Sequence, residues 1–270
     1  MRTIVHLSDL HFGRIDLTVV APLIATIKRI EPDLVAVSGD LTQRARSHQF
    51  EEARAFLDEL PKPQIVVPGN HDVPLHNAFA RFFEPLTKYR RYITSELRPF
   101  YYDDEIAVMG VNTARSLTIK GGRINEEQVA WMSEKLCACD PHVVKIVVTH
   151  HPFDLPEGGD ERQLVGRARM AMEALARCGA DLFLAGHLHI SHTSHTATRY
   201  KIKGHSALVV QAGTATSTRG RGEANSFNVI RVDRPNATVE RLEWKPERAE
   251  FMLAMTERFS HTPDGWVRIK

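Results

Sequence analysis

The 270-residue chain has no long apolar segment. A helix that crosses a bilayer needs roughly 18 consecutive apolar residues, and no run approaches that length. The first residues, Met1–His6, lead directly into a strand-like segment and lack the apolar region of a signal peptide. We therefore expect a cytoplasmic protein without membrane contact.

An excess of charge of one sign is also absent. The chain has 35 Lys and Arg against 33 Asp and Glu, which gives a formal net charge of +2. A basic surface broad enough to hold a nucleic-acid polymer would require a larger positive excess. We expect a small-molecule substrate and no long nucleic acid as partner.

Cysteine is scarce as well. The three cysteines, Cys137, Cys139 and Cys178, form no CxxC pair, and their odd number does not indicate a disulfide framework or a zinc ribbon. The sequence predicts buried or incidental thiols at these positions.

Apolar segments that read as strands alternate with helical periodicity. Thr3–Leu7, Leu34–Ser38 and Ile65–Val67 are short apolar runs, and each is followed by a polar loop. Val143–Thr149 and Asp181–Ala185 repeat this pattern later in the chain. Strands that alternate with helices are typical of an α/β fold with parallel strands, whose functional sites lie at the carboxyl ends of those strands.

The region Asn77–Ile93 also has helical spacing, although Pro85 should break it. Its aromatic residues Phe79, Phe82 and Phe83 are expected in the core.

The chain is expected to consist of one domain and a short extension. Residues 1–235 would form one domain, and residues 236–270 a small β-rich C-terminal extension that packs on the same domain. Trp244 and Trp266 in this extension could contribute to a homodimer interface.

Metal-binding residue types gather at the predicted strand ends. Each short segment alone is weak, because Gly-Asp is often only a turn and Asp-x-His is common in loops. Together they supply seven oxygen and nitrogen donors, too many for one tetrahedral ion but suited to two ions that share a carboxylate. The candidate ligands are Asp9, His11, Asp40, Asn70, His150, His187 and His189.

The order of these segments, DxH, GD, GNHD, H and GHxH, resembles the calcineurin-like metallophosphoesterase family. The resemblance extends from Asp9 to His189 and implies a four-layer α/β/β/α sandwich of two mixed sheets flanked by helices. It also implies two divalent metal ions. The mixed donors admit Mn, Fe, Zn or Co.

Roles follow from the resemblance position by position. One metal would be bound by Asp9, His11, Asp40 and His189. The other would be bound by the bridging Asp40 together with Asn70, His150 and His187.

His71 would be a catalytic residue that stabilises or protonates the leaving oxygen, and Asp72 would orient its ring. Of the neighbouring histidines, His150 rather than His151 is the expected ligand, because the family segment reads His-x-Pro.

Substrate contacts are less sharply indicated. Arg219 and Arg221 occupy a Gly-rich loop, where guanidinium groups could bind phosphate oxygens or simply remain solvated. Asn112 and His151 are further candidates.

The resemblance implies a dinuclear phosphodiesterase in which a metal-bridging hydroxide attacks phosphorus. The short chain with a Ser-Asp-x-His start is similar to class III cyclic-nucleotide phosphodiesterases, so a cyclic nucleotide is the favoured substrate. The alternatives are a pyrophosphatase of nucleotide-linked lipid or sugar precursors, or a phosphomonoesterase. A scaffold without metals is disfavoured, because no candidate ligand is missing.

Overall fold

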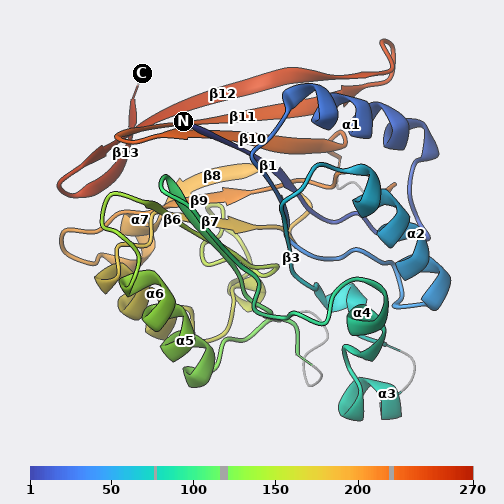
Figure 1. Ribbon diagram of the computed structural model, residues 1–270, viewed down its shortest axis with the longest axis horizontal. Coiled ribbons are helices and arrows are strands. Elements are labelled where there is room, and N and C mark those ends of the chain that lie inside the picture. Colours follow the sequence, from blue (N-terminus) through green and yellow to red (C-terminus); the bar gives the residue numbers. More distant parts are fainter. Residues whose placement is uncertain (76–77, 116–120, 219–221, 270) are drawn as a thin grey trace.

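The computed structural model describes residues 1–75, 78–115, 121–218 and 222–269. Within this part of the chain, two mixed β-sheets pack face to face and helices cover the outer face of each (Figure 1). This arrangement confirms the predicted four-layer α/β/β/α sandwich.

The first sheet contains seven strands of the described chain. They are β1 (Arg2–Leu7), β2 (Leu34–Val37), β3 (Gln64–Val66), β10 (Ser226–Asp233), β11 (Asn236–Lys245), β12 (Glu250–Thr262) and β13 (Gly265–Ile269). Their order is β13-β12-β11-β10-β1-β2-β3. The strands β1, β2 and β3 are parallel, and the others pair antiparallel.

The second sheet contains six strands of the described chain. They are β4 (Phe100–Tyr102), β5 (Ile106–Gly110), β6 (Val144–Val148), β7 (Leu182–Ala185), β8 (His192–His195) and β9 (Leu208–Gln211). Their order is β4-β5-β6-β7-β9-β8, with β5, β6, β7 and β9 parallel. Strands such as β2 and β6 are buried throughout, because a parallel sheet is covered on both faces.

Helices pack on the two outer faces. The first sheet is covered by α1 (Leu17–Ile30), α2 (Ser47–Glu59) and α4 (Thr87–Tyr92), and the second by α5 (Glu126–Cys137) and α6 (Ala168–Arg177). Short helical segments are η1 (Asn70–Asp72), α3 (Ala78–Phe83), η2 (Glu161–Gln163) and α7 (Thr196–Tyr200). None of the described helices combines the length and the hydropathy of a bilayer-spanning segment.

The break at Pro85 is confirmed, but the burial expected for the neighbouring aromatic residues is wrong. Phe79, Phe82 and Phe83 are 66%, 53% and 74% exposed. The short helix α3 instead turns Arg81 inward, where its guanidinium donates to the carbonyl of Pro74. The exposed phenylalanine side chains therefore form an apolar surface on α3.

Residues 236–270 continue the seven-stranded sheet through β11, β12 and β13. Trp244 and Trp266 are 7% and 1% exposed, so both side chains are buried within this chain, and the homodimer interface stays a prediction. Trp266 lies between the sheets and donates from Nε1 to Oδ1 of Asp181 at 2.8 Å.

The prediction of three unpaired thiols is also wrong. Cys137 and Cys178 form a disulfide, while Cys139 is a buried free thiol. The two bonded residues lie 41 positions apart in the chain. They meet because α5 and α6 pack side by side and end at the same level, a tertiary contact that cysteine spacing does not reveal.

Substitution Trp266→Phe should lower the free energy of unfolding by about 1–3 kcal/mol, because it leaves the buried Asp181 oxygen without its donor. Urea titration followed by circular dichroism measures this change. The matched control Trp131→Phe, on the partly exposed face of α5, should change stability by less than about 0.5 kcal/mol. Separate unfolding of residues 236–270 would contradict their integration into the domain.

Candidate metal centre

The seven predicted ligands follow the carboxyl ends of β1, β2, β3, β6 and β7. Backbone hydrogen bonds tie their loops together. The Asp9 N–H donates to the Gly39 carbonyl at 3.1 Å, and the His11 N–H donates to the Asp40 carbonyl at 2.9 Å. The loops of the two sheets therefore converge on one buried cluster.

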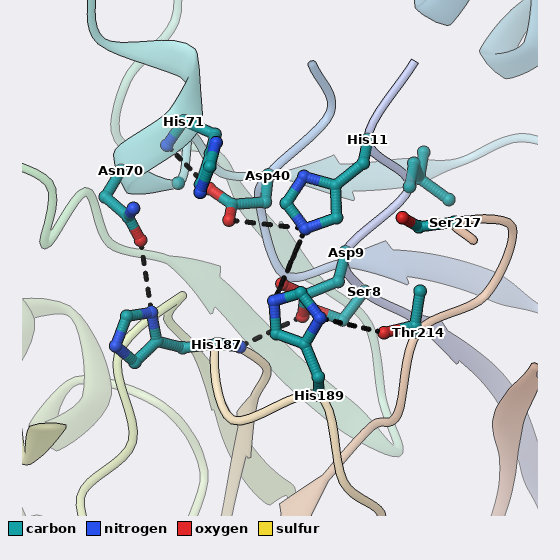
Figure 2. A network of polar contacts seen from close by, with 12 residues as sticks. Ser8, Asp9, His11, Asp40, Asn70, His71, His187, His189, Thr214 and Ser217 are labelled. Atoms are coloured by element: carbon teal, nitrogen blue, oxygen red, sulfur yellow. Dashed lines mark hydrogen bonds and ion pairs between the residues drawn. The ribbon is translucent and has the colours of Figure 1, made fainter. Parts of the chain in front are cut away.

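One group of side chains consists of Asp9, His11, Asp40 and His189, all buried (Figure 2). Oδ1 of Asp9 lies 3.5 Å from Nε2 of His11 and 3.3 Å from Nε2 of His189. Oδ2 of Asp40 lies 3.7 Å from Nε2 of His11. These oxygen and nitrogen atoms surround a common point.

A second group adjoins the first. Oδ1 of Asn70 lies 3.0 Å from Nε2 of His150 and 3.1 Å from Nδ1 of His187. Oδ1 of Asp40 lies 3.4 Å from the same His150 nitrogen. The two oxygens of Asp40 thus face different ligand groups, as a bridging carboxylate requires.

Hydrogen bonds at the ring nitrogen that faces away from the cluster orient two of the imidazole rings. Nδ1 of His150 donates to the Ser38 carbonyl at 2.8 Å, and Nδ1 of His189 lies 3.1 Å from Oγ1 of Thr214. Such partners set the tautomer of a ligating histidine and direct its other nitrogen towards the ion. In both residues Nε2 faces the cluster.

Electrostatics favour ionised carboxylates and a neutral His187, whereas at His150 burial is outweighed by the Asp40 carboxylate and the pKa is raised. Burial opposes ionisation of Asp9, but His189 and the other histidines around it hold the pKa of its carboxyl well below the usual value. Burial also opposes ionisation of Asp40, where His150 nevertheless lowers the pKa. Burial and the charge of His150 lower the pKa of His187 to about 3. At neutral pH the carboxylates are charged and His187 offers a lone pair, as cation binding requires.

Five of the seven side chains sit on left-handed backbone. The φ angles of Asp9, His11, Asp40, His187 and His189 are 52°, 53°, 54°, 72° and 59°. Residues other than glycine adopt this region rarely and at a free-energy cost, and such strain concentrates at functional sites.

Glycines make room for the cluster. A Cβ at Gly186 would lie 1.7 Å from Oγ of Ser8, and one at Gly69 would lie 2.1 Å from Oδ1 of Asp40. The backbone therefore approaches the carboxylates more closely than any other residue type allows.

The donors fit a metal. Oδ1 of Asp9 is buried and accepts no hydrogen bond from the described residues, although an unsatisfied buried carboxylate oxygen is costly. A cation between Asp9, His11 and His189 would satisfy it. The mixture of carboxylate, amide and imidazole donors suits divalent transition metals.

His71 lies beside the cluster, with its ring centroid 4.9 Å from that of His11. Its imidazole Nδ1 is held 2.8 Å from the Gln43 carbonyl, which orients this nitrogen in place of the predicted Asp72. The Asp72 carboxylate instead accepts four hydrogen bonds, from the N–H groups of Leu41, Thr42 and Gly69 and from the Thr42 hydroxyl. Asp72 thus fixes the loops that carry the ligands.

The remaining candidates have different environments. His151 is buried next to His150 and His187, and its Nδ1 lies 2.8 Å from Oγ1 of Thr113. Oδ1 of Asn112 accepts the N–H of Ala114 and so belongs to its own turn. Arg219 and Arg221 fall outside the described residues.

Sequence reasoning missed the groups that position these rings. Ser38 and Gln43 act through backbone carbonyls, which no side-chain motif signals. Thr214 and Thr113 are ordinary hydroxyl residues in distant loops. Gly122 packs against the ring of His151, where a Cβ would lie 2.3 Å from Nδ1.

The family model described as "Calcineurin-like phosphoesterase" matches residues 2–191, which include all the loops that carry the candidate ligands. The chain belongs to this family, as the order of its segments predicted.

Two relatives are similar to this chain over part of its length. It is 29% identical over 167 residues to a probable glycerophosphodiester phosphodiesterase of Arcobacter nitrofigilis, covering 59% of this chain and 57% of that protein. It is 25% identical over 214 residues to a probable cyclic nucleotide phosphodiesterase of Moraxella catarrhalis, covering 74% and 76%. The first match thus spans less than two thirds of that relative's length.

The fold recurs in a purple acid phosphatase from yellow lupin (Lupinus luteus) seeds. The TM-score is 0.70 at 13% identity, and the match covers 94% of this chain and 53% of the lupin chain. At this identity the likeness concerns the fold.

Substitution Asp40→Ala should lower the metal content of purified protein from two ions to one or none, because both ligand groups lose an oxygen. Inductively coupled plasma mass spectrometry measures the ratio of metal to protein. Asp58→Ala, an exposed carboxylate on α2, is the matched control and should retain both ions. Two ions in the Asp40 variant would contradict the bridging role.

Proposed function

We propose that this protein is a metal-dependent phosphodiesterase that hydrolyses a small phosphodiester, with a cyclic nucleotide as the favoured substrate. One observation carries the proposal: Asp40 directs its two carboxylate oxygens at two adjoining ligand groups. In support, family relatives from Arcobacter nitrofigilis and Moraxella catarrhalis are named as phosphodiesterases.

Two divalent ions are proposed, with Asp40 shared between them. The first site would consist of Asp9, His11, Asp40 and His189, and the second of Asp40, Asn70, His150 and His187. When bound, such a pair supplies Lewis-acid charge and an activated water for in-line displacement at phosphorus.

The protein's own groups would complete the chemistry. The Gln43 carbonyl accepts a hydrogen bond from the Nδ1–H of His71, so Nε2 is the nitrogen through which this ring would donate a proton to the leaving oxygen. Ser38 and Thr214 keep His150 and His189 aligned. His151, Asn112, Arg219 and Arg221 remain proposed substrate contacts.

The apolar surface on α3 favours a second candidate, a phosphate ester or pyrophosphate that carries an apolar chain. Three largely exposed phenylalanines in six residues are unusual unless they bind something. The helix follows the His71 loop closely in the chain, and Lys88, Arg90 and Arg91 on α4 add positive charge.

Substitution His71→Ala should preserve bound metal and reduce turnover by roughly 10²–10⁴-fold, the usual contribution of general acid–base catalysis. Steady-state kinetics and metal analysis on the same preparation measure both quantities. His48→Ala, at an exposed position on α2, is the control and should leave turnover unchanged. Full activity of the His71 variant would exclude the assigned role.

A substrate panel with manganese tests the proposed function. It contains bis- and mono-nitrophenyl phosphate, 3′,5′- and 2′,3′-cyclic nucleotides, and nucleotide-diphosphate sugars with and without an acyl chain. We expect hydrolysis of diesters, with a cyclic nucleotide among the substrates. Turnover of monoesters alone would sink the phosphodiesterase proposal.

The same panel distinguishes the second candidate, a substrate with an apolar chain, from a cyclic nucleotide. Replacement of Phe79, Phe82 and Phe83 by serine should raise KM for the acylated substrate and leave the cyclic nucleotides unaffected. An equal effect on both substrates would reject a role in binding the apolar chain.

A further inference from the structure

A pocket of about 410 Å³ lies at the opposite end of the parallel strands from the candidate metal centre. Its walls come from the ends of α5 and α6, the starts of β6 and β7, and the turn between β12 and β13. The disulfide Cys137–Cys178 joins the two helix ends and so fixes one wall. The pocket is independent of the proposed phosphodiesterase activity.

Basic side chains dominate the lining. Lys145, Arg177 and Arg234 face one acidic residue, Asp181, among the described residues that line the pocket. The Asp181 carboxylate already accepts the Trp266 indole N–H and the Lys145 backbone N–H. It also pairs with Arg234 at 3.6 Å. Two positive charges therefore remain without a matching carboxylate.

Lys145 is the more unusual of the two. Its side chain is almost fully buried, with 6% of the residue exposed, and its Nζ donates to the Cys178 carbonyl at 2.8 Å. No carboxylate of the described residues lies within 4.0 Å of it. The bond to Cys178 at the end of α6 uses one of the three N–H donors of the Lys145 ammonium group. A buried charge is costly unless an anion or further acceptors bind the remaining donors.

His205 adds an unsatisfied group. Its Nε2 is buried without a hydrogen-bond partner among the described residues, although the ring lines the pocket. Burial lowers the pKa of His205 and of His261, so both rings are neutral at physiological pH and offer hydrogen bonds rather than charge.

We propose that this pocket binds a small oxyanion, either free inorganic phosphate or the phosphoryl group of a metabolite. Lys145 supplies a buried point charge, Arg177 a guanidinium fork, and His205 a ring nitrogen for the remaining oxygen. The volume lies within the range of small-molecule sites. The strand β6 separates Lys145 from the metal-side His150 by about 17 Å, so the two sites are distinct.

Cys139 provides a local readout in the metal-loaded protein. It lines the pocket and is the free thiol beside the disulfide. Its alkylation by iodoacetamide, followed by mass spectrometry, should slow as phosphate is added and reach a limiting rate when the pocket is saturated. Glycerol phosphate in a parallel arm distinguishes a bound phosphoryl metabolite from free phosphate, and chloride at equal ionic strength measures screening. Phosphate bound at the distant metal centre would leave this rate unchanged.

Lys145→Met should raise the phosphate concentration for half-protection by about tenfold or more, since a charge-assisted hydrogen bond is lost. Arg177→Gln, at an exposed position, should weaken protection too and serves if the buried variant does not fold. Lys135→Met, exposed on α5, should retain normal protection. Absence of protection in the unmodified protein, equal protection by chloride, or undiminished protection in both pocket variants would overturn the proposal.

Discussion

Two ionised carboxylates buried among imidazoles are the constraint on which the structure depends. Asp9 and Asp40 lie almost completely out of water at the junction of the two sheets. Such groups are tolerated only when positive charge or hydrogen bonds compensate them. The surrounding histidines supply part of that compensation, and a bound cation would supply the rest at the unsatisfied Asp9 oxygen.

The backbone around the cluster reflects this constraint. Left-handed conformations at Asp9, His11 and Asp40 recur where chain segments leave β1 and β2, and they aim successive side chains at one point. Gly39 itself has a φ of 89°, and a Cβ there would lie 2.8 Å from the His150 ring. Strain of this kind persists because two packed sheets hold the loops at both ends.

Much of the fold, and the convergence of the candidate ligands, could be predicted, because both follow from local patterns. Apolar runs ending in polar residues define parallel strands, and parallel strands bring their ends together. The side chains of Asp9, Asp40 and Asn70 converge for this reason. The two Asp40 oxygens face different ligand groups, which the sequence does not predict, since spacing does not specify where each carboxylate oxygen points.

Other features depend on contacts that no local pattern encodes. The aromatic spacing of Phe79 and Phe83 is that of a buried helix face, yet α3 buries Arg81 instead. Tryptophan is common at subunit interfaces, but Trp266 fills the space between the two sheets. It does so because β13 extends the first sheet over the second. In each case tertiary packing decided which face of an amphipathic or aromatic segment was covered.

The proposed metal ligands also limit where substrate choice can arise. Interactions with the phosphoryl group are common to every phosphate ester, so the cluster of Asp9, Asp40 and the histidines cannot by itself discriminate among them. Discrimination requires contacts to the rest of the substrate, and buried polar groups left unpaired by the wrong molecule reject it most strongly. His151, held by Thr113, is polar, buried and adjacent to the ligands. The phenylalanines of α3 are apolar and exposed, so they could favour an apolar chain but reject a polar substrate only weakly.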